Sequence, residues 1–473
     1  MKKQYLIATA IAAVVLMSST SHSFKAFNIN GLLNDCLELP ETFFNYANIT
    51  LPPHLNAPNI QAANNTPPDN PITDAGATLG RVLFYDTRLS LNNTRSCASC
   101  HHQATGFSDS NQFSEGFEGG FTGRNSMSLV MARFYAPAHF FWDGRAATLE
   151  DQILMPIQDP VEMGLTLNEL ILKLSNTDYY PPLFEAAFGT PEVTTDRVAK
   201  ATAQFIRSMV SFRTKYDVGR SMLPAGTPPT TPFPNFTQQE NVGKNIFFDP
   251  QQGNCASCHG TDAFIAPEAR NNGLEIIPTD QGLGAVTGSP ADIGLFKVPS
   301  LRNVELSAPY MHDGIFETLD EVIQHYDHGV QAHPNLSPQL REGGTPNGAP
   351  RLLHLELGER AALLAFLKTL TDQTFITDER WSDPFCATTD TNAPELVRYT
   401  MRVFPNPASA HLNIRMLREG AYQLRLVSSA GQTLREARFN GSTYLFDVGG
   451  VPAGAYYLYV AGAEQSVQKV VLQ

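Results

Sequence analysis

The sequence is poor in charge and has no long hydrophobic run after its N-terminus. Charged side chains make up 17% of the 473 residues and hydrophobic ones 42%, which excludes a coiled coil and a wholly disordered chain. Positive charge is the scarcer sign, and the net charge is -13. Because phosphate backbones recruit basic surfaces, we expect no nucleic-acid partner. No later stretch approaches the roughly 18 apolar residues of a transmembrane helix, so we expect no membrane span.

The N-terminus has the layout of a secretory signal peptide. Lys2 and Lys3 precede an apolar run over residues 6–17, and a stretch of small residues follows up to Ser23. The apolar run is too short to cross a bilayer. We therefore expect residues 1–23 to be removed and the mature protein to be exported.

Four of the six cysteines form two identical motifs. Residues 97–101 and 255–259 both read Cys-Ala-Ser-Cys-His, the Cys-x-x-Cys-His pattern that attaches a c-type haem. The two thiols add to the haem vinyl groups, and the histidine that follows becomes an axial ligand of the iron. A four-thiolate zinc site or two disulfides are the alternatives, and the histidine after each pair argues against both. The sequence predicts two covalent haems, with Cys97, Cys100, Cys255 and Cys258 as attachment points and His101 and His259 as iron ligands.

Two cysteines remain, Cys36 and Cys386, one on each side of the region that carries the haem motifs. In an oxidising compartment such a pair is plausibly a disulfide, and we predict a bond between them. The alternative is two unrelated buried cysteines.

Composition and periodicity divide the chain into seven segments. Helical spacing of apolar residues, and a capping box formed by Thr166 and Glu169, indicate helices around both haem motifs. In the tail, Leu412, Ile414 and Met416 alternate with polar residues, which is typical of strands. We expect a mainly α protein with two cytochrome c-like haem domains, followed by a small all-β sandwich. The predicted segments are a signal peptide (1–23), an N-terminal arm (24–72), a first haem domain (73–222), a Pro-rich linker (223–234), a second haem domain (235–385), a linker (386–400) and the β-sandwich (401–473).

Several longer motifs accompany the two haem motifs. They are Leu-Phe-Tyr-Asp at 83–86, Gly-Arg-Asn-Ser at 123–126, Phe-Trp-Asp-Gly-Arg-Ala at 141–146, Pro-Ile-Gln-Asp-Pro-Val-Glu-Met at 156–163, Leu-Arg-Asn-Val at 301–304 and Ala-Pro-Tyr-Met-His-Asp-Gly at 308–314. With these motifs, roughly residues 73 to 385 resemble the bacterial diheme cytochrome c peroxidase family, which includes the MauG-type enzymes.

The tail has its own resemblance. Val-Phe-Pro-Asn-Pro-Ala at 403–408 and the terminal Lys-Val-Val-Leu-Gln look like the C-terminal sorting domain of the type IX secretion system. The resemblance implies the type IX machinery as a partner, transit through the periplasm, and a final place at the cell surface or in the medium.

The family resemblance assigns roles around the first haem, which keeps an open iron position for peroxide. Glu162 occupies the family's acid-base position, and Gln152 and Pro156 match other residues of the distal pocket. Locally, Thr148 is expected to cap a short helix that Pro156 ends. Trp142 matches the indole that relays electrons between the haems. The alternatives are a solvated loop carboxylate for Glu162 and an ordinary core residue for Trp142.

The sequence departs from many family members at the first haem. These members hold a distal histidine eight residues before the asparagine that matches Asn125, and Phe117 stands there instead. No histidine occurs between His102 and His139. We expect a five-coordinate or water-bound first haem that is ready without reductive activation, as in the MauG type.

The second haem has a further departure. A capping box of Thr318 and Glu321 begins a helix whose buried face carries Tyr326. Many members place an axial methionine there, whereas the MauG type has tyrosine. Tyr326 is therefore the expected second ligand of this iron, and phenolate would stabilise Fe(III). The alternatives are Met311, a nearby histidine (His312, His325 or His328), or a core tyrosine.

A calcium site is also implied. Asn125 and the main-chain carbonyls of Ser307 and Pro309 match a site between the haem domains, and hard oxygen donors suit Ca²⁺.

The resemblance thus implies a secreted diheme peroxidase that reduces hydrogen peroxide to water, with electrons from a small c-type cytochrome entering through the second haem. A MauG-type oxidase acting on a protein side chain is the first alternative, and Phe117 and Tyr326 favour it. A non-catalytic electron carrier is the second.

Overall fold

The computed structural model describes residues 37–136, 139–224, 226–385, 401–404, 408–428, 432–462 and 466–472. The chain forms two compact units, a body that extends to Cys386 and a tail that begins at Ala387. Cys36 and Cys386 lie outside the described residues, so the disulfide between them stays a prediction. Their neighbours Leu37 and Phe385 form an antiparallel bridge.

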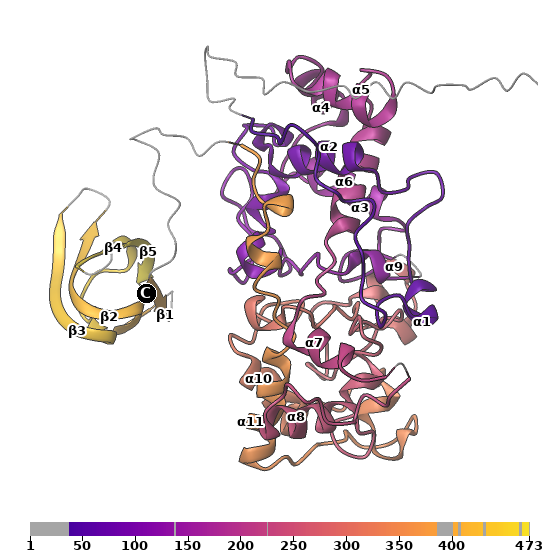
Figure 1. Cartoon of the computed structure of the whole chain (residues 1–473). Coiled ribbons are helices and arrows are strands. Elements are labelled where there is room, and N and C mark those ends of the chain that lie inside the picture. Colours follow the sequence, from indigo (N-terminus) through magenta and orange to yellow (C-terminus); the bar gives the residue numbers. More distant parts are fainter. Residues whose placement is uncertain are drawn as a thin grey trace, which may run out of the picture. The chain divides into compact units, whose positions relative to one another are not determined.

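The body is built from helices joined by long loops (Figure 1). Its helices are α1 (Pro58–Gln61), α2 (Asp74–Tyr85), α3 (Leu149–Gln158), α4 (Leu167–Ser175), α5 (Tyr180–Phe188), α6 (Thr195–Ser208), α7 (Lys215–Ser221), α8 (Gln238–Phe248), α9 (Leu283–Thr287), α10 (Leu319–Gln324) and α11 (Leu357–Lys368). The predicted capping boxes at Thr166 and Thr318 begin α4 and α10. Along the described residues, no helix is both long and apolar enough to cross a membrane.

One helix pair recurs in each half of the body. Figure 1 shows α2 and α6 at one end and α8 and α11 at the other. A Cβ atom on Gly80 of α2 would lie 2.0 Å from the carbonyl oxygen of Ala201 in α6. A Cβ atom on Gly243 of α8 would likewise lie 1.8 Å from the carbonyl oxygen of Ala362 in α11. Each pair can therefore approach this closely only because glycine stands at the crossing.

The end of the body returns to the first helix pair. Trp381 is buried, and its Nε1 donates a hydrogen bond of 3.0 Å to Oγ of Ser208 at the end of α6. The rings of Phe107 and Phe375 also meet edge to face, 5.8 Å apart. Residues 375–385 thus pack with the first half, and the body forms one compact unit. The predicted domain boundaries at 73–222 and 235–385 stay predictions.

A buried charge cluster fastens the N-terminal arm to the second half. The guanidinium of Arg302 donates two hydrogen bonds of 2.9 Å to the carboxylate of Asp217 in α7. Nε2 of His54, in the arm, lies 2.7 Å from the same carboxylate. The side chains of Arg302 and Asp217 are almost fully buried, so removal of one charge would leave the other without compensation.

The tail is a single curled antiparallel sheet rather than the expected sandwich of two sheets (Figure 1). Its long strand β2 pairs with β1 through its first half and with β4 through its second, while β3 runs along most of its length. One sheet therefore bends around its own core, in which Leu412, Leu424 and Leu458 are buried. The alternation predicted for this segment is confirmed. The strands are β1 (Met401–Phe404), β2 (His411–Ser428), β3 (Thr433–Asp447), β4 (Gly454–Gly462) and β5 (Ser466–Leu472).

Candidate active site

Two short turns hold the histidines of the Cys-x-x-Cys-His motifs. Residues 97–99 and 255–257 each form one turn of 3-10 helix. The backbone amides of His101 and His259 donate to the carbonyl oxygens of Cys97 and Cys255, at 3.0 and 2.8 Å. Each motif thus closes on itself, which brings the histidine next to its pair of thiols.

The zinc and disulfide alternatives fail for these cysteines. Cys97, Cys100, Cys255 and Cys258 are all unbonded. In the described part of the chain, no group of three or more His, Cys, Asp or Glu side chains is placed to hold a metal ion. The two motifs therefore stand apart, as two separate haem sites require.

Burial favours the neutral form of both motif histidines. Nδ1 of His101 donates a hydrogen bond of 2.9 Å to the carbonyl oxygen of Phe107, which leaves Nε2 free for a metal. Burial lowers the pKa of His101. Burial also lowers the pKa of His259 to about 4, against the opposing influence of the carbonyls of Phe264 and Pro299. A neutral imidazole is the form that binds iron.

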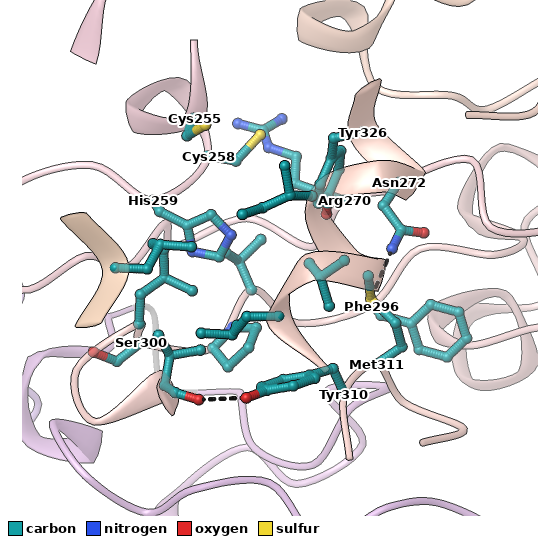
Figure 2. A pocket seen from close by; sticks show the side chains of 18 of the residues that line it. Cys255, Cys258, His259, Arg270, Asn272, Phe296, Ser300, Tyr310, Met311 and Tyr326 are labelled. Atoms are coloured by element: carbon teal, nitrogen blue, oxygen red, sulfur yellow. Dashed lines mark hydrogen bonds between the residues drawn. The ribbon is translucent and has the colours of Figure 1, made fainter. Parts of the chain in front are cut away.

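A large cavity opens beside the second motif. Cys255, Cys258 and His259 line it, together with a mostly apolar wall to which α10 and α11 contribute. Figure 2 shows His259 entering from one side and Asn272, Met311 and Tyr326 standing on the other. Its lining residues include no aspartate or glutamate. An apolar, carboxylate-free cavity with two thiols and a neutral imidazole fits a covalently attached haem.

Tyr326 reaches this cavity from an irregular turn. Helix α10 ends at Gln324, and residues 325–329 form one turn of π-helix. The side chain is half-buried, and burial raises the pKa of its hydroxyl. The capping box at Thr318 predicts Tyr326 on a regular helix, but the wider turn that follows α10 carries this residue instead.

The competing ligands separate into two groups. Met311 and His312 line the cavity, and His325 and His328 are not among its lining residues. The sulfur of Met311 accepts a hydrogen bond of 3.3 Å from the side-chain amide of Asn272. His312 stacks on Phe296 with ring centroids 3.8 Å apart. Tyr326, Met311 and His312 are thus the candidates that line the cavity.

Trp142 stands in the wall between the two halves of the body. It lines the cavity of the second motif, and its Nε1 donates a hydrogen bond of 2.8 Å to the carbonyl oxygen of Asn125. Asn125, Ser307 and Pro309 line the same cavity. The side-chain amide of Asn125 donates to the carbonyls of Asn111 and Gln112, which leaves its oxygen for another partner. All three residues that the resemblance implies for calcium thus line this cavity.

Glu162 lies beside the first motif. Burial is the main cause of the raised pKa values of the Cys97 and Cys100 thiols, and the charge of Glu162 adds a smaller contribution to both, so Glu162 lies within electrostatic range of the motif. Burial, with a smaller contribution from Asp159, raises the pKa of Glu162 to about 7, while Arg145 lowers it. The side chain is half-buried. It is therefore not the solvated loop carboxylate that the alternative requires.

Phe117 is the direct neighbour of Glu162. Its backbone amide donates a hydrogen bond of 3.0 Å to the carbonyl oxygen of Glu162. A Cβ atom on Gly116 would lie 1.6 Å from the carbonyl oxygen of Val161, so the two loops touch along their backbones. Phe117, at which the sequence departs from the pattern expected for many family members, thus lies beside Glu162, and its side chain offers no ligand.

Gln152 and Pro156 both lie on α3, one turn apart. Thr148 caps this helix as expected, since its side chain accepts from the amide of Asp151. The expectation that Pro156 ends the helix is wrong, because α3 continues to Gln158. Proline removes the hydrogen bond to the carbonyl of Gln152, but its fixed φ suits a helix and the last turn tolerates it.

Three residues near these sites had no assigned role in the sequence. Arg145 acts electrostatically on Glu162, Asn272 bonds Met311, and Lys297 lines the second cavity. Arg145 belongs to the same motif as Trp142, at residues 141–146, so the sequence itself could have pointed to a role for Arg145. Lys297 and Asn272 carried no pattern that separates them from surface residues.

Comparison with known proteins matches both parts of the chain. Residues 74–221 match the model of the family described as di-haem cytochrome c peroxidase, and residues 402–473 match that of a secretion system C-terminal sorting domain. The methylamine utilization protein MauG of Methylophilus methylotrophus is 31% identical over 306 residues, which covers 64% of this chain and 84% of that protein. Cytochrome c551 peroxidase of Nitrosomonas europaea is 33% identical over 303 residues, covering 62% and 79%.

A solved structure agrees with these matches. The crystal structure of a MauG-like protein associated with microbial copper homeostasis superposes with a TM-score of 0.59 at 33% identity. The superposition covers 72% of this chain and 99% of that one. The family is one of oxidoreductases with two c-type haems, in agreement with the two motifs. This chain therefore belongs to the di-haem cytochrome c peroxidase family, and its tail is a secretion system C-terminal sorting domain.

Proposed function

We propose that this protein is an exported peroxidase that reduces hydrogen peroxide beside the first haem motif. Electrons from a small c-type cytochrome enter through the second motif. The observation that carries the proposal is Glu162 itself, a half-buried carboxyl group within electrostatic range of both thiols of the first motif. Perturbed carboxyl groups in such places are typical of acid-base catalysts.

Glu162 is assigned the proton transfer. A bound haem supplies an iron that exchanges electrons with peroxide. As a carboxylate, Glu162 takes a proton from one oxygen of peroxide, and as an acid it returns that proton to the departing oxygen. A pKa of about 7 lets the group serve in both forms near neutral pH. Gln152 is assigned to orient peroxide through its amide, and Pro156 to shape the pocket wall.

The first iron is assigned an open position for peroxide. Phe117 stands beside Glu162 and has no atom that can bind iron. A resting enzyme with this arrangement would need no prior reduction to release a ligand.

The second motif is assigned electron transfer. Tyr326 is proposed to hold the iron of this haem together with His259, since both would face a haem in this cavity from different sides (Figure 2). Trp142 is the proposed relay, because it lines this cavity and bonds to Asn125 of the first half. The side-chain oxygen of Asn125 and the carbonyls of Ser307 and Pro309 are proposed to hold Ca²⁺, which these oxygen donors suit.

Export is proposed to begin with the signal peptide over residues 1–23 and to end with the tail. The sorting domain indicates export through the periplasm. We propose passage through the type IX machinery to the cell surface or the medium.

A MauG-type oxidation of a protein side chain is the second candidate. Phe117 and Tyr326 favour it, because phenolate stabilises oxidised iron and the missing histidine leaves the first iron open. Relatives named MauG and relatives named peroxidase match this chain to a similar extent.

Peroxide consumption by the haem-loaded protein separates these candidates. The expected result is peroxide loss coupled to oxidation of a reduced small c-type cytochrome, two electrons for each peroxide reduced to water. Peroxide-dependent oxidation of a protein substrate, without cytochrome turnover, would select the MauG-type reaction. Absence of both reactions would contradict the proposal and leave an electron carrier.

A further inference from the structure

Lys297 is a cation in the wall of the second cavity that has no acidic partner. The cavity is lined by one arginine and one lysine, Arg270 and Lys297, and by no carboxylate. Arg270 pairs with Glu268 at 2.9 Å. Among the described residues, no carboxylate lies within ion-pair distance of Lys297.

The surroundings of Lys297 do not replace such a partner. Its Nζ lies 3.9 Å from the ring centroid of Tyr135, a cation-π contact that contributes about 0.5–2 kcal/mol. Burial lowers the pKa of Lys297 to about 7, with no acidic group to oppose it. A half-buried ammonium group is stabilised when an anion accompanies it. The cavity that Lys297 lines therefore favours a bound group that carries a negative charge.

The haem that this cavity fits carries such charges. A haem bears two carboxylates on one edge, and the vinyl groups that join the cysteines lie on the rest of the ring. The backbone amide of Lys297 donates a hydrogen bond of 2.8 Å to the carbonyl oxygen of Trp142. Lys297 therefore belongs to the part of the wall that Trp142 forms, on the side of the first half of the body.

We propose that the ammonium group of Lys297 binds a propionate carboxylate of the haem attached to Cys255 and Cys258, and holds that edge of the ring toward Trp142. This inference rests on the haem that the family implies and not on the peroxide reaction. The ion pair positions the ring, and its positive charge stabilises the reduced iron.

Redox titration of the haem-loaded protein tests this role. The variants are K297M, which removes the charge, K297R, which keeps it, and K215M as a matched control. Lys215 is a partly exposed lysine of α7 that pairs with Glu240 at 2.6 Å and does not line the cavity. At a fixed potential, K297M should lower the ratio of reduced to oxidised second haem by about tenfold. This is the effect expected when one unit charge is removed at roughly 10 Å from the iron. K297R and K215M should leave the ratio near the wild-type value.

A second readout does not depend on the potential. The propionate bending band in the resonance Raman spectrum should shift in K297M and stay unchanged in K215M. If K297M does not incorporate haem, K297Q provides the same comparison, because it keeps a donor but not the charge. Wild-type potentials together with an unshifted propionate band in the neutral variant would overturn the assignment, whatever the peroxide activity.

Discussion

Nε1 of Trp142 donates a hydrogen bond of 2.8 Å to the carbonyl oxygen of Asn125, which also lines the second cavity. The ring of Trp142 also meets His312 edge to face, with centroids 6.5 Å apart. A residue of the first half thus contacts the pocket of the second motif through its indole. This contact supports the relay role proposed for Trp142.

W142F should slow electron transfer between the haems while both haems remain bound. Phenylalanine keeps an aromatic ring but loses the hydrogen bond and the indole, which is easier to oxidise. Stopped-flow spectroscopy of the half-reduced protein after mixing with peroxide would measure this rate.

The only other tryptophan provides the control. Trp381 is buried and bonds Ser208, far along the chain from the motifs. W381F should cost about 2 kcal/mol of folding free energy, because it leaves a buried polar group unpaired. Its electron-transfer rate should stay normal. Equal slowing in both variants would argue against a relay at Trp142.

E162Q should lower peroxide turnover by about 10²- to 10⁴-fold, the usual contribution of a positioned acid-base group. Glutamine keeps the size of the side chain but cannot exchange a proton. Both haems should still be present in the absorption spectrum. E185Q, at an exposed position of α5, is the matched control and should keep full turnover.

The pH dependence of the peroxide reaction is expected to follow the ionisation of Glu162. Because burial raises the pKa of Glu162 to about 7, the carboxylate that accepts the first proton is scarce below that pH. The rate of the peroxide reaction should therefore rise with pH through about 7 in the wild type. E162Q should lack this step. A profile that is flat between pH 5 and 8 in the wild type would contradict the assignment.

Y326F and M311L should have different effects on the second haem. If Tyr326 is the axial ligand, Y326F opens a coordination position and converts the low-spin iron to high spin. M311L should leave the spin state unchanged, since it removes only the sulfur that accepts from Asn272. Electronic absorption and EPR spectra would compare the two. A sulfur-to-iron charge-transfer band in the wild type that disappears in M311L would assign the ligand to Met311 instead.

D217N should lower the free energy of unfolding by about 3–5 kcal/mol, because Arg302 is left buried without its counter-charge. Burial opposes ionisation of Asp217, but the charge of Arg302 and hydrogen bonds from His54 and Thr214 outweigh it and hold the pKa well below its usual range. This stabilisation is complete above the pKa of an unfolded carboxyl group and is lost as pH falls through the lower folded value. Acid unfolding of D217N should therefore depend less steeply on pH than that of the wild type.

Local patterns predicted the parts of the sites that depend on neighbouring residues. The Cys-x-x-Cys-His motifs form the turns that bring His101 and His259 to their thiols, and the capping boxes at Thr166 and Thr318 begin helices. The resemblance placed Glu162 beside the first motif, where its charge acts on Cys97 and Cys100.

Features set by distant contacts were not predictable in this way. The curl of the tail depends on the pairing of β2 with three other strands, which alternation alone does not specify. The return of Trp381 to Ser208 joins residues far apart in sequence. Helix α3 passes Pro156 because proline in a last turn removes a single hydrogen bond, and only the surroundings decide whether the helix tolerates that loss.

EPR spectroscopy of the resting, fully oxidised protein tests most directly the claim that the two irons differ. We predict one high-spin iron, at the first motif with Phe117 beside it, and one low-spin iron, at the second motif with both axial positions filled. Addition of peroxide should then remove the high-spin signal. Two low-spin irons that do not respond to peroxide, in the oxidised and the half-reduced protein alike, would contradict the account.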